Sequence, residues 1–382
     1  MYKENQYRNA KMETKPTFFR SRRKFISSLG AVPLAVGIDS LLSPSGAHLQ
    51  VDQASCEWPS STAIAASGEA NQIASLPYAD GTYIQAKMVF NVDSSGVALN
   101  KIFDDSKTLP NNDTIVTNLG SSYATVFTPD YSVEGISKSI PPREATVIRN
   151  ETVVRKATES ETPSGSPTDG PVHLAFIRTS SPRNVANALS NSSLWRSYTT
   201  AGCWPSGIGP YPLWMSKRAE MTNLKLSFDP WAAANQATPS GKSAASFSIN
   251  SNLWWIPSMS DAAVHHCHYK NFIEVHTQIL GVGRMQKFDD RESRTTDCSS
   301  AGVYPLGTTG PPPPSAYYGV PGISSDEGAF GQGMYEEYRL APGDTNVPFP
   351  YVDDNMNFIY PWHQYYADTD CLWVVWELIP IT

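Results

Sequence analysis

The sequence has few cationic residues and no long apolar run. It contains 29 Lys and Arg against 36 Asp and Glu, which gives a net charge of -7. No basic run interleaved with aromatic residues follows the N-terminus, so nucleic acid is not expected as a partner. A bilayer-spanning helix needs about 20 consecutive apolar residues. No stretch meets that length, so no stable membrane span is expected in the mature chain.

Cysteine is scarce as well, and no CxxC pair is present. The five cysteines are Cys56, Cys203, Cys267, Cys298 and Cys371. In an oxidising compartment an odd number leaves at least one thiol unpaired, unless two chains are linked to each other. The spacing of the five does not decide which of them pair.

Proline and glycine, by contrast, are abundant, with 30 and 25 copies in 382 residues. Such a composition favours short strands joined by turns and long loops, with few long helices. Apolar residues alternate with polar ones in Ile84–Val92 and Leu224–Phe228, which predicts half-buried strands. A helix is expected only around Asn184–Leu194. We therefore expect an all-β fold with enough apolar residues for one or two domains.

Residues 1–47 have the pattern of an export signal. A polar, basic start leads to the pair Arg22 and Arg23, then Phe25, then the mildly apolar run Ser27–Leu42. This order resembles a bacterial twin-arginine signal peptide. A membrane anchor and an accidental arginine pair are the alternatives. The mature protein is expected in the periplasm or outside the cell.

Histidine is rare, yet four of its seven copies lie in the stretch 264–288. His266 and His268 are two residues apart, so they project from the same face of an extended strand. Glu274, His276 and Gln278 repeat this spacing on a following strand. The two strands would direct imidazoles and a carboxylate at one volume, which is the donor set of a borderline transition metal. The sequence therefore predicts a metal site.

The same residues form a recognisable two-part pattern. His266-x-His268, Glu274 and Gly281 are followed, well downstream, by the Pro-Gly-Asp turn at Gly343, by Pro348 or Pro361, and by His363. This pattern resembles the signature of the cupin superfamily over roughly Ser246 to the C-terminus. It departs from the family in having five residues between His268 and Glu274 and Ala367 in place of the closing asparagine.

The resemblance implies an antiparallel β-barrel, or jelly roll, in the C-terminal half. It implies one divalent ion, Zn, Mn or Fe, held by His266, His268, Glu274 and His363. Residues 236–382 would form this barrel, with a long loop at 289–333. Residues 48–235 would form a β-rich N-terminal domain, which would be a second, metal-free cupin barrel if the protein is a bicupin.

Three segments suggest a narrower relationship. EVHTQILGVGRMQKF, LAPGDTNVPF and YPWHQYYADTDCLW are similar to the cupin portion of aldos-2-ulose dehydratases. That resemblance implies a lyase or isomerase that dehydrates a keto-sugar, so a small carbohydrate is the expected partner. A homodimer is compatible with this reading.

Side-chain roles follow from strand parity and from the expected chemistry. His276 would face inward beside Glu274, and an imidazole suits general acid or base catalysis at neutral pH. The candidates for holding substrate hydroxyls are Gln278, Arg339, Tyr365 and Glu337. Three other readings stay open: an iron-dependent dioxygenase, a secreted carbohydrate-binding or structural cupin without catalysis, and a purely structural metal.

Overall fold

The structure is a computed structural model that describes a large part of the chain. The described residues are 61–103, 113–127, 138–148, 152–166, 168–197, 212–262, 272–288, 334–346, 351–359 and 362–381. The predicted signal at 1–47, the loop at 289–333 and the predicted ligands His266 and His268 lie outside these ranges. Cysteines 56, 203, 267 and 298 lie outside them as well, whereas Cys371 is a buried free thiol. Val51–Thr382 forms one compact unit.

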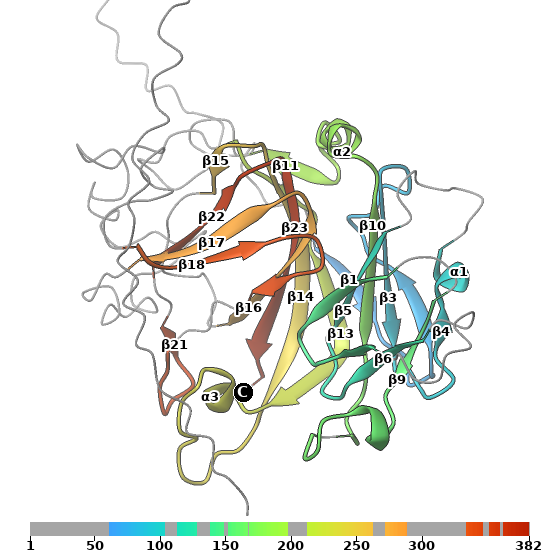
Figure 1. Ribbon diagram of the computed structural model, residues 1–382, viewed down its shortest axis with the longest axis vertical. Coiled ribbons are helices and arrows are strands. Elements are labelled where there is room, and N and C mark those ends of the chain that lie inside the picture. Colours follow the sequence, from blue (N-terminus) through green and yellow to red (C-terminus); the bar gives the residue numbers. More distant parts are fainter. Residues whose placement is uncertain are drawn as a thin grey trace, which may run out of the picture. The chain divides into compact units, whose positions relative to one another are not determined.

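Most of the regular structure is β-strand, arranged in four sheets and a small hairpin (Figure 1). Sheet A contains β1 (Thr62–Ala65), β11 (Trp195–Ser197), β12 (Trp214–Ser216), β13 (Ala219–Phe228), β14 (Ala245–Ile256), β16 (Ile273–Leu280), β19 (Thr345–Asn346) and β23 (Cys371–Pro380). Sheet B contains β2 (Gln72–Ser75), β3 (Ile84–Phe90), β5 (Thr114–Asn118), β8 (Ala145–Ile148) and β10 (Leu174–Thr179).

The two remaining sheets have four strands each. Sheet C contains β4 (Val97–Ala98), β6 (Ala124–Phe127), β7 (Lys138–Ile140) and β9 (Val153–Lys156). Sheet D contains β15 (Ser260–Asp261), β17 (Gly283–Phe288), β18 (Met334–Leu340) and β22 (Trp362–Ala367). The hairpin pairs β20 (Tyr351–Val352) with β21 (Phe358–Ile359). Strand pairing is antiparallel throughout the described residues except between β1 and β13.

Helices in the described part of the chain are short: α1 (Leu99–Ile102), α2 (Pro182–Ala188), α3 (Pro230–Ala233) and the 3-10 turn η3 (Glu159–Glu161). The predicted helix at Asn184–Leu194 is therefore misplaced, because α2 begins and ends earlier. Pro182 stands at its first turn, where the fixed φ of proline favours helix initiation. Asn191 accepts a bond from the backbone of Ser193, a local turn that competes with helix. None of the described helices is long and apolar enough to cross a membrane.

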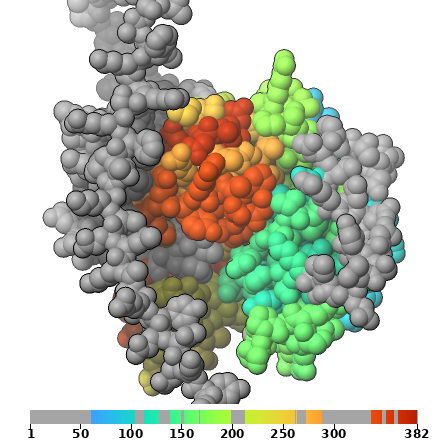
Figure 2. Space-filling view, in the orientation of Figure 1, coloured from blue at the N-terminus to red at the C-terminus, as the bar shows by residue number. Residues whose placement is uncertain are grey.

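Three apolar clusters fill the spaces between the four sheets, so the sheets are stacked in layers. One cluster joins sheets A and B and includes Ile177 and Trp376. A second lies between sheets A and D and includes Trp373, and a third lies between sheets B and C and includes Phe176. Ile177 and Phe176 are consecutive, so the two faces of β10 serve two different cores. The space-filling view shows the orange and red strands packed against green segments of the N-terminal half (Figure 2).

The sheet topology is repeated within the chain. The order β2-β3-β10-β5-β8 in sheet B matches β13-β14-β23-β16-β19 in sheet A, and β4-β9-β6-β7 in sheet C matches β15-β22-β17-β18 in sheet D. Each repeat also contains the same turn contact. The amide of Arg143 donates to the carbonyl of Asn118 at the end of β5, and the amide of Gly343 donates to the carbonyl of Gln278 on β16. Both turn residues have positive φ.

We call sheets B and C barrel 1, and sheets A and D barrel 2. The prediction of an all-β fold, with an antiparallel barrel in the C-terminal half and a second β-rich unit before it, is confirmed. β13 ends at Phe228, before the predicted domain boundary at residue 235, yet it belongs to the sheet of barrel 2.

A substitution at Gly281 tests the close backbone contact between Gly281 and Asp370 in barrel 2. Gly281 has φ +77°, and a Cβ there would collide with the carbonyl oxygen of Asp370. Gly241 has φ +79° but open space around it, so it controls for backbone strain alone. We expect Gly281→Ala to lower the free energy of unfolding by more than about 3 kcal/mol, against about 1 kcal/mol for Gly241→Ala. Urea unfolding followed by tryptophan fluorescence checks this, and equal losses would contradict the close contact.

Candidate metal centre

Glu274, His276 and His363 come together in the interior of barrel 2. Glu274 and His276 lie on β16 of sheet A, and His363 lies on β22 of the facing sheet D. They border a small cavity. The volume within which the centre of a water molecule can lie is about 20 Å³, which is enough for one water or one ion. The described residues that line it are Trp254, Ala262, Glu274, His276, Met285, His363, Tyr365, Trp373 and Val375.

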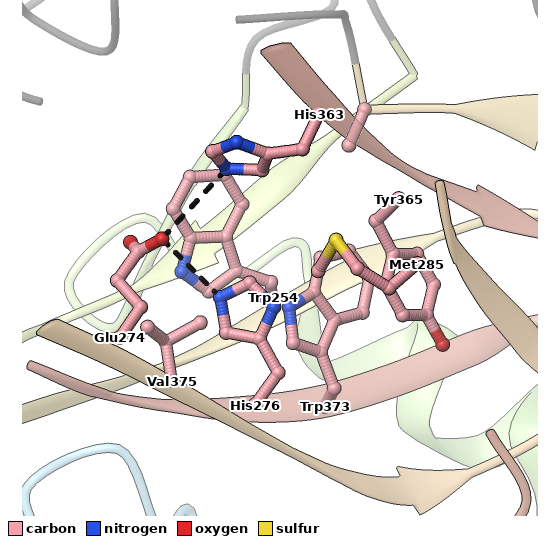
Figure 3. Close-up of a pocket in the computed structure, with 9 residues that line it drawn as sticks. Trp254, Glu274, His276, Met285, His363, Tyr365, Trp373 and Val375 are labelled. Atoms are coloured by element: carbon pink, nitrogen blue, oxygen red, sulfur yellow. Dashed lines mark ion pairs between the residues drawn. The ribbon is translucent and has the colours of Figure 1, made fainter. Parts of the chain in front are cut away.

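The carboxylate of Glu274 stands between the two imidazoles (Figure 3). Its Oε2 atom lies 3.5 Å from Nε2 of His276 and 3.9 Å from Nε2 of His363. All three residues are buried, with 5%, 6% and 1% of their surface exposed. Donor atoms that share an ion at about 2.1 Å are roughly 3 to 4 Å apart. The observed spacing is therefore that of neighbouring ligands rather than of good hydrogen bonds.

The three side chains do not close a complete coordination shell on their own. In the described ranges, no group of three or more His, Cys, Asp or Glu side chains meets the geometry of a formed metal site. The donor set is nevertheless suited to a divalent transition metal, because it offers two imidazole nitrogens and one carboxylate. The other two predicted ligands, His266 and His268, lie outside the described residues.

Tyr365 lines the cavity, and the buried Gln278 is its hydrogen-bond partner. The Tyr365 hydroxyl donates to Oε1 of Gln278, and Nε2 of Gln278 donates to the carbonyl of Leu280 at 2.7 Å. The Tyr365 ring stacks on Trp373 with 4.0 Å between ring centroids. Burial raises the pKa of Tyr365 well above its usual range. Tyr365 therefore stays neutral, and its hydroxyl serves the internal bond to Gln278.

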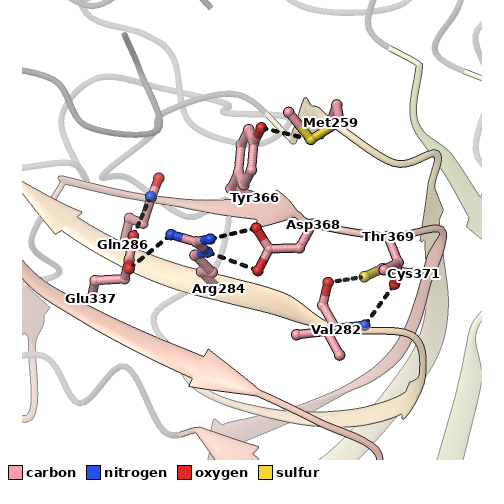
Figure 4. Close-up of polar contacts among 9 residues, drawn as sticks. All are labelled: Met259, Val282, Arg284, Gln286, Glu337, Tyr366, Asp368, Thr369 and Cys371. Atoms are coloured by element: carbon pink, nitrogen blue, oxygen red, sulfur yellow. Dashed lines mark hydrogen bonds and ion pairs between the residues drawn. The ribbon is translucent and has the colours of Figure 1, made fainter. Parts of the chain in front are cut away.

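Glu337 and Arg339, predicted to bind substrate, are exposed on β18 and do not line the cavity. Glu337 contacts Arg284, whose Nη1 is 3.1 Å away and whose Nη2 is 2.6 Å from Asp368 (Figure 4). Opposite charges around it raise the pKa of Arg284, with the hydrogen bond to Asp368 as the largest cause. The four residues predicted to bind substrate therefore do not lie together. Gln278 and Tyr365 are in the interior of barrel 2, whereas Glu337 and Arg339 are on its surface.

A second carboxylate accompanies Glu274 in sheet A. Glu377 lies directly opposite Glu274 in the β16–β23 register, so both side chains emerge from the same face. Arg218 places its Nη2 atom 2.7 Å from Oε1 of Glu377. The ion pair with Arg218 compensates the negative charge of Glu377. Sequence reasoning missed Glu377 because its place beside Glu274 depends on which strands pair.

Trp254 supplies another wall of the cavity. Neighbouring residues on a strand point to opposite sides, so only one of Trp254 and Trp255 can face the site. Trp255 packs instead in the core between sheets A and B.

The equivalent positions of barrel 1 carry different chemistry. Matching registers place Thr114 where barrel 2 has Glu274, and Val116 where it has His276. Arg178 takes the place of Glu377 and donates from Nε to Thr114 at 2.7 Å. His173 is buried, and its Nδ1 accepts from the amide of Asn91. Burial lowers the pKa of His173 to about 4, so it remains neutral.

Comparisons with known proteins give structural matches only. No protein-family model matches the chain, and no curated protein does. One similar solved structure is a Bacillus subtilis oxalate decarboxylase studied for its Mn(II) centres, with 9% identity over 79% of this chain and 70% of that one, and a TM-score of 0.23. An oxalate oxidase has 10% identity and a TM-score of 0.19 over 34% of this chain.

A third match is a conserved Streptococcus pyogenes protein of unknown function, with 11% identity and a TM-score of 0.18 over 42% of this chain and 79% of that one. The chain spans 41% of the length of the oxalate oxidase that it matches. At these identities and TM-scores, the matches establish no activity for this chain.

Replacing Tyr365 tests the wall of the site. Tyr365→Phe removes the donor to Gln278 and leaves a buried amide oxygen without it, so the free energy of unfolding should fall by about 1–3 kcal/mol. Tyr338→Phe is the control, because Tyr338 is 46% exposed and should change stability by less than about 0.5 kcal/mol. Chemical denaturation measures both. Equal, small effects would show that the hydroxyl is not needed to hold Gln278.

Proposed function

We propose that this protein is an exported, metal-dependent cupin-type enzyme, a lyase or isomerase that dehydrates a keto-sugar or related carbohydrate. The observation that carries the metal part is the convergence of Glu274, His276 and His363 on one small buried cavity. The sugar and the reaction come from the resemblance of three segments to aldos-2-ulose dehydratases. Export to the periplasm or beyond comes from the arginine pair in residues 1–47.

A divalent ion, Zn, Mn or Fe, fits the donor set. Glu274 and His363 would hold it from sheets A and D, together with His266 and His268, which lie outside the described residues. A buried carboxylate is unfavourable unless a cation or several donors compensate it, and the ion would supply that charge. When bound, it would polarise a substrate carbonyl and stabilise the negative charge that develops on its oxygen.

The protein's own groups would handle the proton and exclude water. His276 would take a proton at Nε2 from the carbon next to the carbonyl and return it to the leaving hydroxyl. Trp254, Trp373 and Met285 give the cavity an apolar wall, which strengthens electrostatic interactions inside it. Tyr365 and Gln278 would keep Trp373 in place rather than touch the reacting atoms.

The composition of the site favours one further candidate. Glu274, His276 and His363 are two histidines and one carboxylate, the set that non-haem iron oxygenases use. If His276 is a ligand rather than a base, the protein would be an iron-dependent dioxygenase. Oxygen uptake during turnover, and loss of turnover under strict anaerobiosis, would identify this function in place of the lyase.

Glu274→Gln should remove the metal without unfolding the chain. We expect the affinity for Mn²⁺ or Zn²⁺ to fall at least about a hundredfold, because an amide replaces an anionic ligand. Wild-type protein should gain about 2.7 kcal/mol of stability at a free metal concentration one hundred times its Kd, and the variant at most about 0.4 kcal/mol. Calorimetric titration and thermal unfolding test this, with the exposed Glu336→Gln as control. Unchanged metal affinity in Glu274→Gln would remove the basis of the proposal.

His276→Ala should separate proton transfer from metal binding. If His276 is the base, the variant keeps its metal and loses about 10²- to 10⁴-fold in turnover of a keto-sugar such as anhydrofructose, followed by the ultraviolet absorbance of the dehydrated product. Thr277→Val, on the opposite face of the same strand, is the control. Loss of metal together with turnover would make His276 a ligand instead. If neither changes, His276 has no part in the reaction.

A further inference from the structure

A long strand forms one edge of sheet D. β18 is an outermost strand of that sheet, and in the described part of the chain it pairs with β17 alone. It has seven residues, whereas every other outermost strand of the four described sheets has four or fewer. Alternate N–H and C=O groups of an edge strand point away from the sheet and can pair with a further strand. Proteins commonly keep such edges short for this reason, and β18 is the exception.

Both faces of β18 are accessible to solvent near its C-terminal end. The four consecutive residues Glu336–Arg339 are all exposed, and Tyr338 keeps 46% of its surface in contact with water. The space-filling view shows this part of the chain as an orange patch on the surface (Figure 2). Successive residues of a strand point to opposite faces, so four exposed neighbours mean that neither face is covered at this point.

The equivalent edge of barrel 1 provides an internal comparison. β7 and β18 end at corresponding residues, Ile140 and Leu340, each three positions before the turn residue with positive φ. β7 has only three residues, and the alignment places its Lys138 where β18 has Tyr338. A lysine on an edge strand disfavours pairing with another chain, because its charge would lose water. A long, unprotected edge is therefore a property of barrel 2 and not a necessary result of the topology.

The charges at this edge are not balanced within one chain. Arg284 contacts two carboxylates, Glu337 at 3.1 Å and Asp368 at 2.6 Å, so one positive charge serves two negative ones. Arg339 lies directly opposite Arg284 in the β17–β18 register, which places two like charges side by side. Among the described residues, no carboxylate pairs with Arg339. The edge therefore has an acidic residue with too little positive charge near it and, two positions further on, an arginine that has no acidic partner.

We infer that β18 pairs with β18 of a second copy of this chain, in an antiparallel, two-fold symmetric dimer centred on Tyr338. In this register Tyr338 lies opposite its own counterpart, and Glu337 of each chain lies opposite the partner's Arg339. The pairing continues the sheet from one chain to the next, buries both tyrosine rings and creates two pairs of opposite charge. A register centred on Glu337 would instead place two carboxylates opposite each other, which is unfavourable.

The dimer gives Glu337 and Arg339 a role that the metal centre does not. Both were predicted to hold a substrate, and neither lines the cavity. The inference goes beyond the proposed function and does not rest on it, so loss of either proposal leaves the other in place. Because main-chain bonds along one edge would supply most of the contact, we expect an interface at the low end of the usual sizes and a Kd of about 1–100 µM.

Sedimentation velocity of the purified, metal-loaded protein over about 1–300 µM should show a monomer–dimer equilibrium. Tyr338→Lys copies the residue of barrel 1, and Arg339→Glu opposes the partner's Glu337 with a like charge. Each should raise Kd at least about tenfold, because every change occurs twice in the dimer. The double variant Glu337→Arg, Arg339→Glu should restore association, since it only exchanges the two signs. Tyr351→Lys is the control, because Tyr351 is 60% exposed and lies on the β20–β21 hairpin.

Crosslinking tests the register. On the two-fold axis the Cα atoms of the two copies of residue 338 would be about 4.5–5.5 Å apart, a distance that a disulfide can bridge. Tyr338→Cys should therefore form covalent dimers on mild oxidation with diamide, seen on a non-reducing gel. Glu336→Cys, two positions away on the same face, should not exceed the background that the five native cysteines give in the wild type.

Three outcomes overturn the inference. One is a protein that stays monomeric at the highest concentration. Another is a dimer that survives both Tyr338→Lys and Arg339→Glu, because it then uses a different surface. The third is equal crosslinking of Tyr338→Cys and Glu336→Cys, which contradicts a two-fold axis at Tyr338. Association that weakens in both single variants and returns in the double variant, together with crosslinking through position 338 alone, supports the β18 dimer.

Discussion

The buried carboxylate of Glu274 is the constraint on which barrel 2 depends. It is almost completely removed from water and lies near two imidazoles at distances longer than good hydrogen bonds. A negative charge in such a place is unfavourable unless positive charge or several donors compensate it. The neighbouring Glu377 already has Arg218 as its partner. Two imidazoles, those of His276 and His363, point their Nε2 atoms at the same oxygen of Glu274, an arrangement that suits a shared cation.

The comparison of the two barrels shows how one topology supports two kinds of interior. Both have the same strand order, and in both the same turn bonds to the equivalent strand, β5 in barrel 1 and β16 in barrel 2. In barrel 1 the interior positions hold Thr114, Val116 and Arg178, which pack or bond within the protein. In barrel 2 they hold carboxylates and imidazoles. The strand pairing thus provides a scaffold, and a few inward-facing side chains decide whether it becomes a packed core or a site.

The interior of barrel 2 combines apolar walls with polar groups on one sheet face. Trp254, Trp373 and Met285 line the cavity, while Glu274 and His276 reach it from β16 and Glu377 lies opposite Glu274 on β23. Binding sites for small molecules commonly pair a mostly apolar lining with a few directed polar groups.

Residue spacing along a single strand was enough to predict much of this protein. Alternation placed Glu274, His276 and Gln278 on one face of β16 and put one of two adjacent tryptophans at the cavity, because side chains on a strand must alternate. Composition was enough for the all-β class. Sequence did not reveal Glu377, or the separation of Glu337 and Arg339 from Tyr365. Those depend on which strands pair and in which register, which is set by long-range packing and by turns far apart in the chain. Only the tertiary structure brings β14, β16, β19 and β23 side by side, and with them the groups that face one cavity.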